Sequence, residues 1–196
     1  MLNIKNHLQC SAGFLKYFNA FCMLFFGSIM KYSKQQIFLH WLSAVVIIWA
    51  TLSGFYMAMF QPNPEIKQWV SFFNVSLTTV YIPFFFLRIW YAIAHGKPEE
   101  TTLTAQEAKL AHWGHLALYI NISVVLITGV LMMDRNINVF NVFFIPHPVA
   151  NIELLMLFKQ VHILSCLSLS LLIVGHVLAI VKHRFSGHNV LKRMLP

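Results

Sequence analysis

Long apolar runs separated by short polar segments dominate this chain of 196 residues. About 20 consecutive apolar residues are enough for a helix to cross the hydrocarbon core of a bilayer. Short connections favour helices that alternate in direction, because each helix then packs beside the one before it. The pattern therefore predicts an all-α, integral membrane four-helix up-down bundle. Its four expected spans are Ile37–Phe60, Trp69–Ala94, His112–Met133 and Leu154–Val181.

The segments between these runs carry local signals of their own. Gln61–Pro64 reads QPNP, which predicts a tight turn. Thr104 and Glu107 have the spacing of a capping box that opens the third helix. Residues 134–153 are rich in aromatic side chains but too short to span, and they predict a loop or short helix in the membrane interface. Three aromatic side chains are then expected to face lipid: Phe140, Phe143 and Phe144.

The net charge of +8 is explained by membrane topology. If both termini are cytoplasmic, three of the fourteen Lys and Arg residues lie on the other side, namely Lys67, Arg135 and Lys159. The other eleven lie in cytoplasmic segments, which is the asymmetry of the positive-inside rule. With 58% hydrophobic and 10% charged residues, the chain does not have the composition of a soluble domain. We therefore expect a lipid bilayer, and no nucleic acid, as its partner.

The first 29 residues do not fit the pattern of the rest. They contain a short apolar stretch flanked by Lys16 and Lys31, with no small-residue cleavage site after it. Met30 is followed by a basic, polar lead-in that runs directly into the first span, as at the start of a complete protein. We therefore predict that residues 1–29 are an N-terminal extension upstream of the true start, and that residues 30–196 form the four-helix domain.

Three histidines stand at matched positions within the apolar runs. His162 and His176 are fourteen residues apart, which on a helix brings them within roughly 40° of each other and separates them by about 21 Å. Antiparallel threading places His40, early in the first span, at the depth of His176. This spacing suits two stacked haems, one near each membrane face, with His40 and His176 as a bis-imidazole pair. A single membrane histidine can instead bond a neighbouring helix.

The partner of His162 is expected from the start of the second span, where the sequence has Asn74. An amide is a poor iron ligand beside imidazole. The sequence has no CxxCH, so haem would be held by ligation alone, and Cys166, one turn after His162, fits a small packing residue. The residues thus support one haem firmly and leave the second open.

The order and spacing of several segments resemble the bacterial cytochrome b561 family, over residues 30–196. They are KYSKQQIFLHWL, NVS…LR, AHWGHLALY, Met132–Asn136 and VH…GH…NVLKRMLP. The resemblance implies a four-helix dihaem protein of the bacterial inner membrane, with His40 and His176 on the cytoplasmic haem b and His162 on the periplasmic one. The family's fourth ligand falls on Asn74, fourteen residues before Arg88, which aligns without a gap.

This departure leaves three arrangements for the periplasmic haem. It is absent, with Asn74 and Phe72 or Phe73 filling its space. Alternatively, it is five-coordinate on His162, high-spin and open to small ligands. In the third arrangement a substitute ligand reaches the iron, and the candidates are His147, Met132, Met133 and Met59.

Other polar residues near the cytoplasmic side are candidates for accessory roles. His112 and His115 share a helix face and could donate to a haem propionate, bind and protonate a quinone, or bond a neighbouring helix. Arg88 could pair with a propionate or act as a positive-inside anchor. His183 is a weaker quinone-site candidate, and two further histidines read as surface residues, His7 and His95.

Two classes of function follow. The first is an electron-transfer oxidoreductase that exchanges electrons between a quinone and a small or protein redox partner. The resemblance adds a specific case, in which superoxide is oxidised and ubiquinone is reduced within the respiratory chain. The second class is a non-catalytic, haem-bearing membrane anchor of a larger dehydrogenase. We recognise no paired carboxylates, no phosphate loop and no nucleophile with a base nearby in the sequence. The sequence therefore does not indicate hydrolytic or group-transfer chemistry.

Overall fold

The computed structural model describes residues 32–95, 104–186 and 194, so the predicted extension before Met30 lies outside the described residues. Four long helices account for most of the described chain, and they confirm the predicted all-α membrane bundle. A helix of 27 residues is about 40 Å long, which exceeds the thickness of the hydrocarbon core. The helices are α2 (Lys34–Phe60), α3 (Pro64–His95), α4 (Ala105–Leu131) and α5 (Ile152–Phe185).

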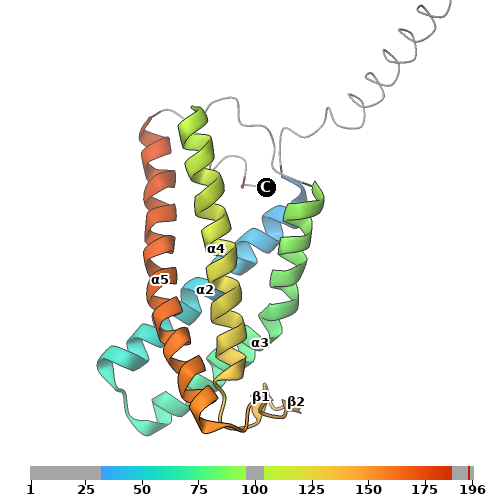
Figure 1. Ribbon diagram of the computed structural model, residues 1–196, viewed down its shortest axis with the longest axis vertical. Helices are drawn as coiled ribbons and strands as arrows, with labels where there is room; N and C mark the ends of the chain where they lie inside the picture. Colours follow the sequence, from blue (N-terminus) through green and yellow to red (C-terminus); the bar gives the residue numbers. More distant parts are fainter. Residues whose placement is uncertain (1–31, 96–103, 187–193, 195–196) are drawn as a thin grey trace, which may run out of the picture.

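The helices alternate in direction along the bundle (Figure 1). The closest pairings are α2 with α3 and α4 with α5, and α4 and α5 run side by side over most of their length (Figure 1). A small β-hairpin lies between α4 and α5 in the chain, at the end where α2 finishes and α3 begins. We call this the hairpin end. The other end, where α2 begins and α5 finishes, is called the opposite end.

One small core joins all four helices. Its buried members are Val46 of α2, Tyr81 and Phe85 of α3, Ile122 of α4 and Leu169 of α5. Most other large apolar side chains point outward, for example on α5, where only Leu169 is buried among the helix's described residues. In water such a surface would be unfavourable, but in lipid it is the expected one, since only the backbone must be satisfied internally. The burial pattern therefore agrees with a bundle surrounded by lipid.

Side chains and backbone turns fix where the helices begin and end. Thr104 and Glu107 form the predicted capping box, and Ser33 with Gln36 forms a second one at the start of α2. Gln61 ends α2 in a left-handed conformation, with φ of 42°. The predicted tight turn between the first two spans is therefore confirmed.

The connection between α4 and α5 contains a hairpin, not the loop or short helix that the sequence predicted. Strands β1 (Ile137–Val139) and β2 (Phe143–Ile145) pair in antiparallel register. The turn between them uses Phe140 and Asn141, both with positive φ. Ile137 and Val139 are each 1% exposed because β1 packs against α3. Tertiary contact thus decides the conformation of this segment.

A buried serine attaches the hairpin to α3. The hydroxyl of Ser76 donates to the Asn138 carbonyl at 3.0 Å and accepts from the backbone N–H of Phe140 at 3.1 Å. The Phe140 ring also meets Phe72 and Phe73 edge-on, whereas Phe143 and Phe144 are exposed, as expected for side chains that face lipid. Phe140 therefore contributes to an internal aromatic contact as well as to the surface.

Replacing Ser76 should weaken this attachment. In Ser76→Ala the Phe140 N–H and the Asn138 carbonyl lose their partner, which costs about 2 kcal/mol of unfolding free energy. We expect a lower unfolding temperature in detergent, followed by circular dichroism. Ser123→Ala is the matched control, because the Ser123 hydroxyl bonds only the Tyr119 carbonyl of its own helix. Equal unfolding temperatures for the two variants would contradict the role of Ser76.

Candidate functional site

Four polar side chains, one from each helix, meet near the opposite end of the bundle. We call them the His40 cluster: His40 of α2, Arg88 of α3, His115 of α4 and His176 of α5. Nη2 of Arg88 lies 3.1 Å from Nδ1 of His40, and the ring centroids of His115 and His176 are 5.3 Å apart. His115 and His176 both lie within electrostatic range of His40. The cluster thus unites two predicted ligands with two predicted accessory residues.

The contact between Arg88 and His40 fixes the ring proton of His40. A guanidinium group can only donate, so Nδ1 of His40 accepts and Nε2 carries the proton. Iron ligation through Nε2 requires the other tautomer, with the proton on Nδ1. Arg88 must then turn to another acceptor, and it already lies 5.3 Å from the Tyr119 ring centre within the same region. A carboxylate such as a haem propionate would supply a stronger acceptor for it.

His162 is held by a separate set of bonds on α4. Its Nδ1 lies 3.1 Å from the Val125 carbonyl and 3.1 Å from the Thr128 hydroxyl. A carbonyl can only accept, so Nδ1 carries the proton; the Thr128 hydroxyl donates to Val124 and accepts from the ring. Nε2 therefore carries the lone pair. Metal-ligating histidines are commonly oriented by such a bond from the far nitrogen to a carbonyl.

A glycine on α4 provides the space for the His162 ring. A Cβ atom on Gly129 would lie 3.2 Å from Cε1 and 3.6 Å from Nδ1 of His162. Sequence reasoning did not identify Val125, Thr128 or Gly129 as site residues. The available signal was the Thr-Gly pair within the third apolar run, since both residue types allow close helix approach in membranes.

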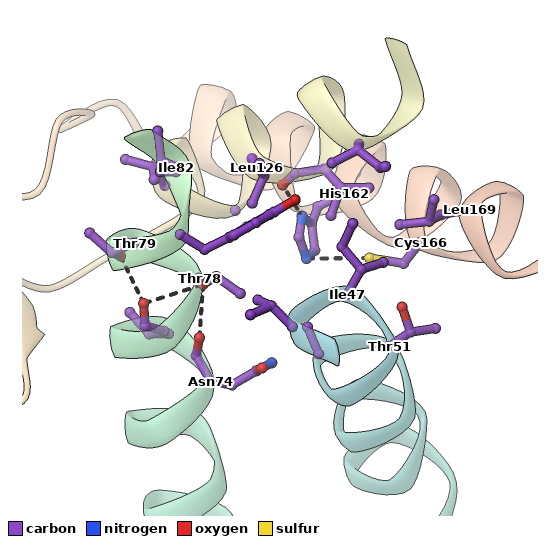
Figure 2. Close-up of a pocket in the computed structure, with 18 of the residues that line it drawn as sticks. Ile47, Thr51, Asn74, Thr78, Thr79, Ile82, Leu126, His162, Cys166 and Leu169 are labelled. Carbon is purple, nitrogen blue, oxygen red and sulfur yellow. Dashed lines mark hydrogen bonds between the residues drawn. The ribbon is translucent and has the colours of Figure 1, made fainter. Parts of the chain in front are cut away.

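A cavity of about 120 Å³ lies beside His162 and is lined by residues of all four helices. Asn74 of α3 also lines this cavity. Asn74 and His162 each lie ten positions after the first residue of their helices, α3 and α5. Figure 2 shows His162 and Asn74 entering this region from different helices, with Nε2 of His162 next to the Cys166 sulfur at 3.5 Å. Oδ1 of Asn74 is buried and has no hydrogen-bond partner within residues 32–95 and 104–186 or at residue 194. The cavity thus combines one imidazole, one thiol and one unsatisfied amide.

The family of the protein follows from the whole length of the bundle. The family model of prokaryotic cytochrome b561 matches residues 31–196. The chain belongs to the prokaryotic cytochrome b561 family. No curated protein matches the chain. Membership, together with the four helices among the described residues that are long enough to span, makes it a multi-pass protein of the bacterial inner membrane that serves haem b electron transfer.

The His40 cluster of this cytochrome b561 has the donors that a haem b needs. His40 and His176 reach the interior from different helices and can supply two axial imidazoles, and Arg88 can pair with a propionate. The rings of His115 and His176 form a T-shaped contact with an interplanar angle of 69°. His115 is therefore placed to orient one of the two expected ligands.

The structure separates the two histidines of α4. His115 is half-buried and turned toward α5. His112 is exposed, and its ring centroid lies 5.9 Å from that of Trp113. His183 is half-buried near the last turn of α5, beside the Lys182–Glu107 ion pair at 3.6 Å. His95 is exposed and stacks on Tyr91. His7 lies outside the described residues.

The proposed substitutes for a ligand opposite His162 are placed very differently. Met132 lines the cavity, and Met133 is half-buried close by in the chain. Met59 is 74% exposed, and His147 is exposed beside Asn136 on the connection after the hairpin. Of these four residues, Met132 is therefore the one with access to the space around His162.

Proposed function

We propose that this cytochrome b561 exchanges electrons between a quinone dissolved in the bilayer and a second redox partner, using a haem b held by His40 and His176. The observation that carries this proposal is the His40 cluster, in which all four helices contribute one polar side chain at a common depth. Intramembrane polar side chains are costly and mark functional sites. Two imidazoles with a cation beside them match the donors and charge that a haem b with propionates requires.

The chain's own residues then have distinct tasks. Haem b, when bound, would supply a one-electron carrier whose potential depends on its ligands and surroundings. His40 and His176 would hold it, Arg88 would neutralise a propionate, and His115 would orient His176 through their ring contact. Buried aromatic side chains of the core, those of Tyr81 and Phe85, exclude water from the region between the helices.

Ubiquinone is the proposed partner near the opposite end of the bundle. A quinone needs two protons with its two electrons, and histidine transfers protons at neutral pH. His112 is exposed on α4 and lies one turn from His115, so it can meet a ligand that approaches through the lipid. We assign proton transfer with the quinone to His112 and the inward, haem-side role to His115.

Superoxide is the proposed electron donor at the hairpin end. Two superoxide anions each give up one electron and leave as dioxygen. The two electrons, with two protons from the cytoplasmic side, convert one ubiquinone to ubiquinol. This direction of transfer agrees with the predicted topology, in which both termini are cytoplasmic and the hairpin is periplasmic.

The quinone proposal is tested by mixing a short-chain ubiquinol with the full chain, purified in detergent with its haem oxidised. We expect the haem to become reduced, as followed by its absorbance. In His112→Ala the rate should fall by about a hundredfold, the lower range for loss of a positioned proton-transfer group. His95→Ala, which changes another exposed histidine near the same end, should keep the original rate.

Two results would oppose this assignment. Equal rates in His112→Ala and His95→Ala would remove His112 from proton transfer. A haem that ubiquinol never reduces, but that a co-purifying dehydrogenase does reduce, would replace the quinone proposal with the membrane-anchor function.

A further inference from the structure

We propose that His162 binds a second haem b as its single protein ligand, and that Asn74 leaves the other axial side open to a small ligand. The inference rests on the proposed electron-transfer function only in its use of haem b. It concerns the cavity beside His162, which shares no residue with the His40 cluster. The ligand class is a small polar molecule, either a diatomic or water.

The bonding of His162 favours a ligating role. Its Nδ1 proton is held by two acceptors on α4, the Val125 carbonyl and the Thr128 hydroxyl. Within the described part of the chain, the hydrogen-bond contact of Nε2 is the Cys166 sulfur at 3.5 Å, and a thiol is a weak donor that is readily displaced. A histidine that served only to join two helices would need no such free nitrogen facing a cavity. The ring is thus oriented as a metal-binding imidazole would be.

The surroundings of His162 are also shaped to keep space around it. Gly129 leaves room where any Cβ would crowd the ring, and a cavity of about 120 Å³, lined by residues of all four helices, lies beside the ring. Phe72 and Phe73 do not line this cavity. Phe73 packs against Trp49, Trp69 and Phe140, and Phe72 packs against Phe140. The bulky side chains that could have filled the space of a lost haem are therefore engaged elsewhere.

Asn74 explains why the second axial position stays open. It lies at the same depth as His162, but its amide is a poor iron ligand. Its buried Oδ1 has no partner among the residues that the structure describes, and burying an unsatisfied polar atom is unfavourable unless a ligand or water bonds it. The amide also has two N–H groups that can donate to a bound ligand. Asn74 is accordingly assigned the role of contacting the small ligand, not the iron.

Carbon monoxide is the probe for this site. The full chain is purified in detergent, and the oxidised protein is recorded by electron paramagnetic resonance. We expect a low-spin signal from the His40 cluster and a high-spin signal from the His162 site. Carbon monoxide added to the reduced protein should bind at the second site alone. His162→Ala should remove the high-spin signal and lower the haem content by about half, since one of two axial-ligand sites is lost.

Three further variants make the assignment specific. Cys166→Ser should keep the high-spin signal, because the thiol only contacts Nε2. Asn74→His should convert the high-spin signal to low-spin and abolish carbon monoxide binding. Asn74→Leu is its matched control: leucine cannot ligate iron, so the high-spin signal should persist. The low-spin signal of the His40 cluster should remain in all four variants and shows that each is folded.

Several outcomes would overturn the proposal. A wild-type protein with only low-spin signals and no carbon monoxide binding would show either a missing second haem or a substitute ligand such as Met132. Loss of the high-spin signal in Cys166→Ser together with its survival in His162→Ala would assign the iron to the thiol. Each of these results leaves the low-spin signal of the His40 cluster in place, so the electron-transfer function is tested separately.

Discussion

His176→Ala is expected to abolish the low-spin haem b signal of this cytochrome b561. Two axial imidazoles are needed for that spectrum, and His40 alone cannot supply both. The His115 ring is a neighbour of His176, but it lies on α4 and contacts the edge of that ring. The His115 ring therefore differs in position and orientation from the ring that is removed. Reduced-minus-oxidised absorbance and electron paramagnetic resonance measure the loss directly.

His40→Ala should give the same loss, because the two histidines act as one pair. His95→Ala is the control for histidine removal at the same end of the bundle, and it should retain the complete low-spin signal. A bis-imidazole spectrum that survives in His176→Ala or in His40→Ala would show that the ligand assignment is wrong for that residue.

Gly129→Val should have the second large effect, on the His162 site. The new Cβ would lie 3.2 Å from Cε1 of His162, and its two methyl groups would require still more space. The ring must then turn away from the Val125 carbonyl and the Thr128 hydroxyl, so Nε2 no longer faces the cavity. We expect the high-spin signal and carbon monoxide binding to disappear, with about half of the haem lost.

The same substitution at another glycine separates crowding from a general effect on helices. A Cβ atom on Gly54 of α2 would have no heavy atom within 4 Å, so Gly54→Val adds a β-branched residue without touching a ligand. Both variants change helix propensity alike. If Gly54→Val and Gly129→Val lose the high-spin signal equally, then the close approach of Gly129 to His162 is not what holds the site.

Much of the bundle could be predicted from the sequence, because lipid demands long apolar helices and their ends carry local signals. The four spans, the turn at Gln61 and the capping box at Thr104 all depend on residues close together in the chain. The hairpin does not. Ile137 and Val139 form a strand because β1 packs against α3 and Ser76 bonds the turn, and these contacts join residues about sixty positions apart.

The candidate site divides in the same way. The common depth of His40 and His176 follows from spacing and antiparallel threading, and so does the common depth of Asn74 and His162. The spacing does not show which of His112 and His115 faces the interior of the bundle. Residues three apart on a helix differ in direction by about 60°, so the rotation of α4 about its axis decides between them. The bonds of His162 to Val125 and Thr128 depend on the rotation of α5 against α4, which periodicity alone leaves open.

We expect the bundle to hold haem b at two depths, although only one depth has a pair of histidines. The most direct measurement is the amount of haem b per polypeptide in the full chain purified in detergent. We expect about two haems per chain, one for the His40 cluster and one for the His162 site. A single haem would contradict the His162 site and confine the cofactor to the His40 cluster. A protein without haem would contradict both sites and leave the bundle as a membrane scaffold.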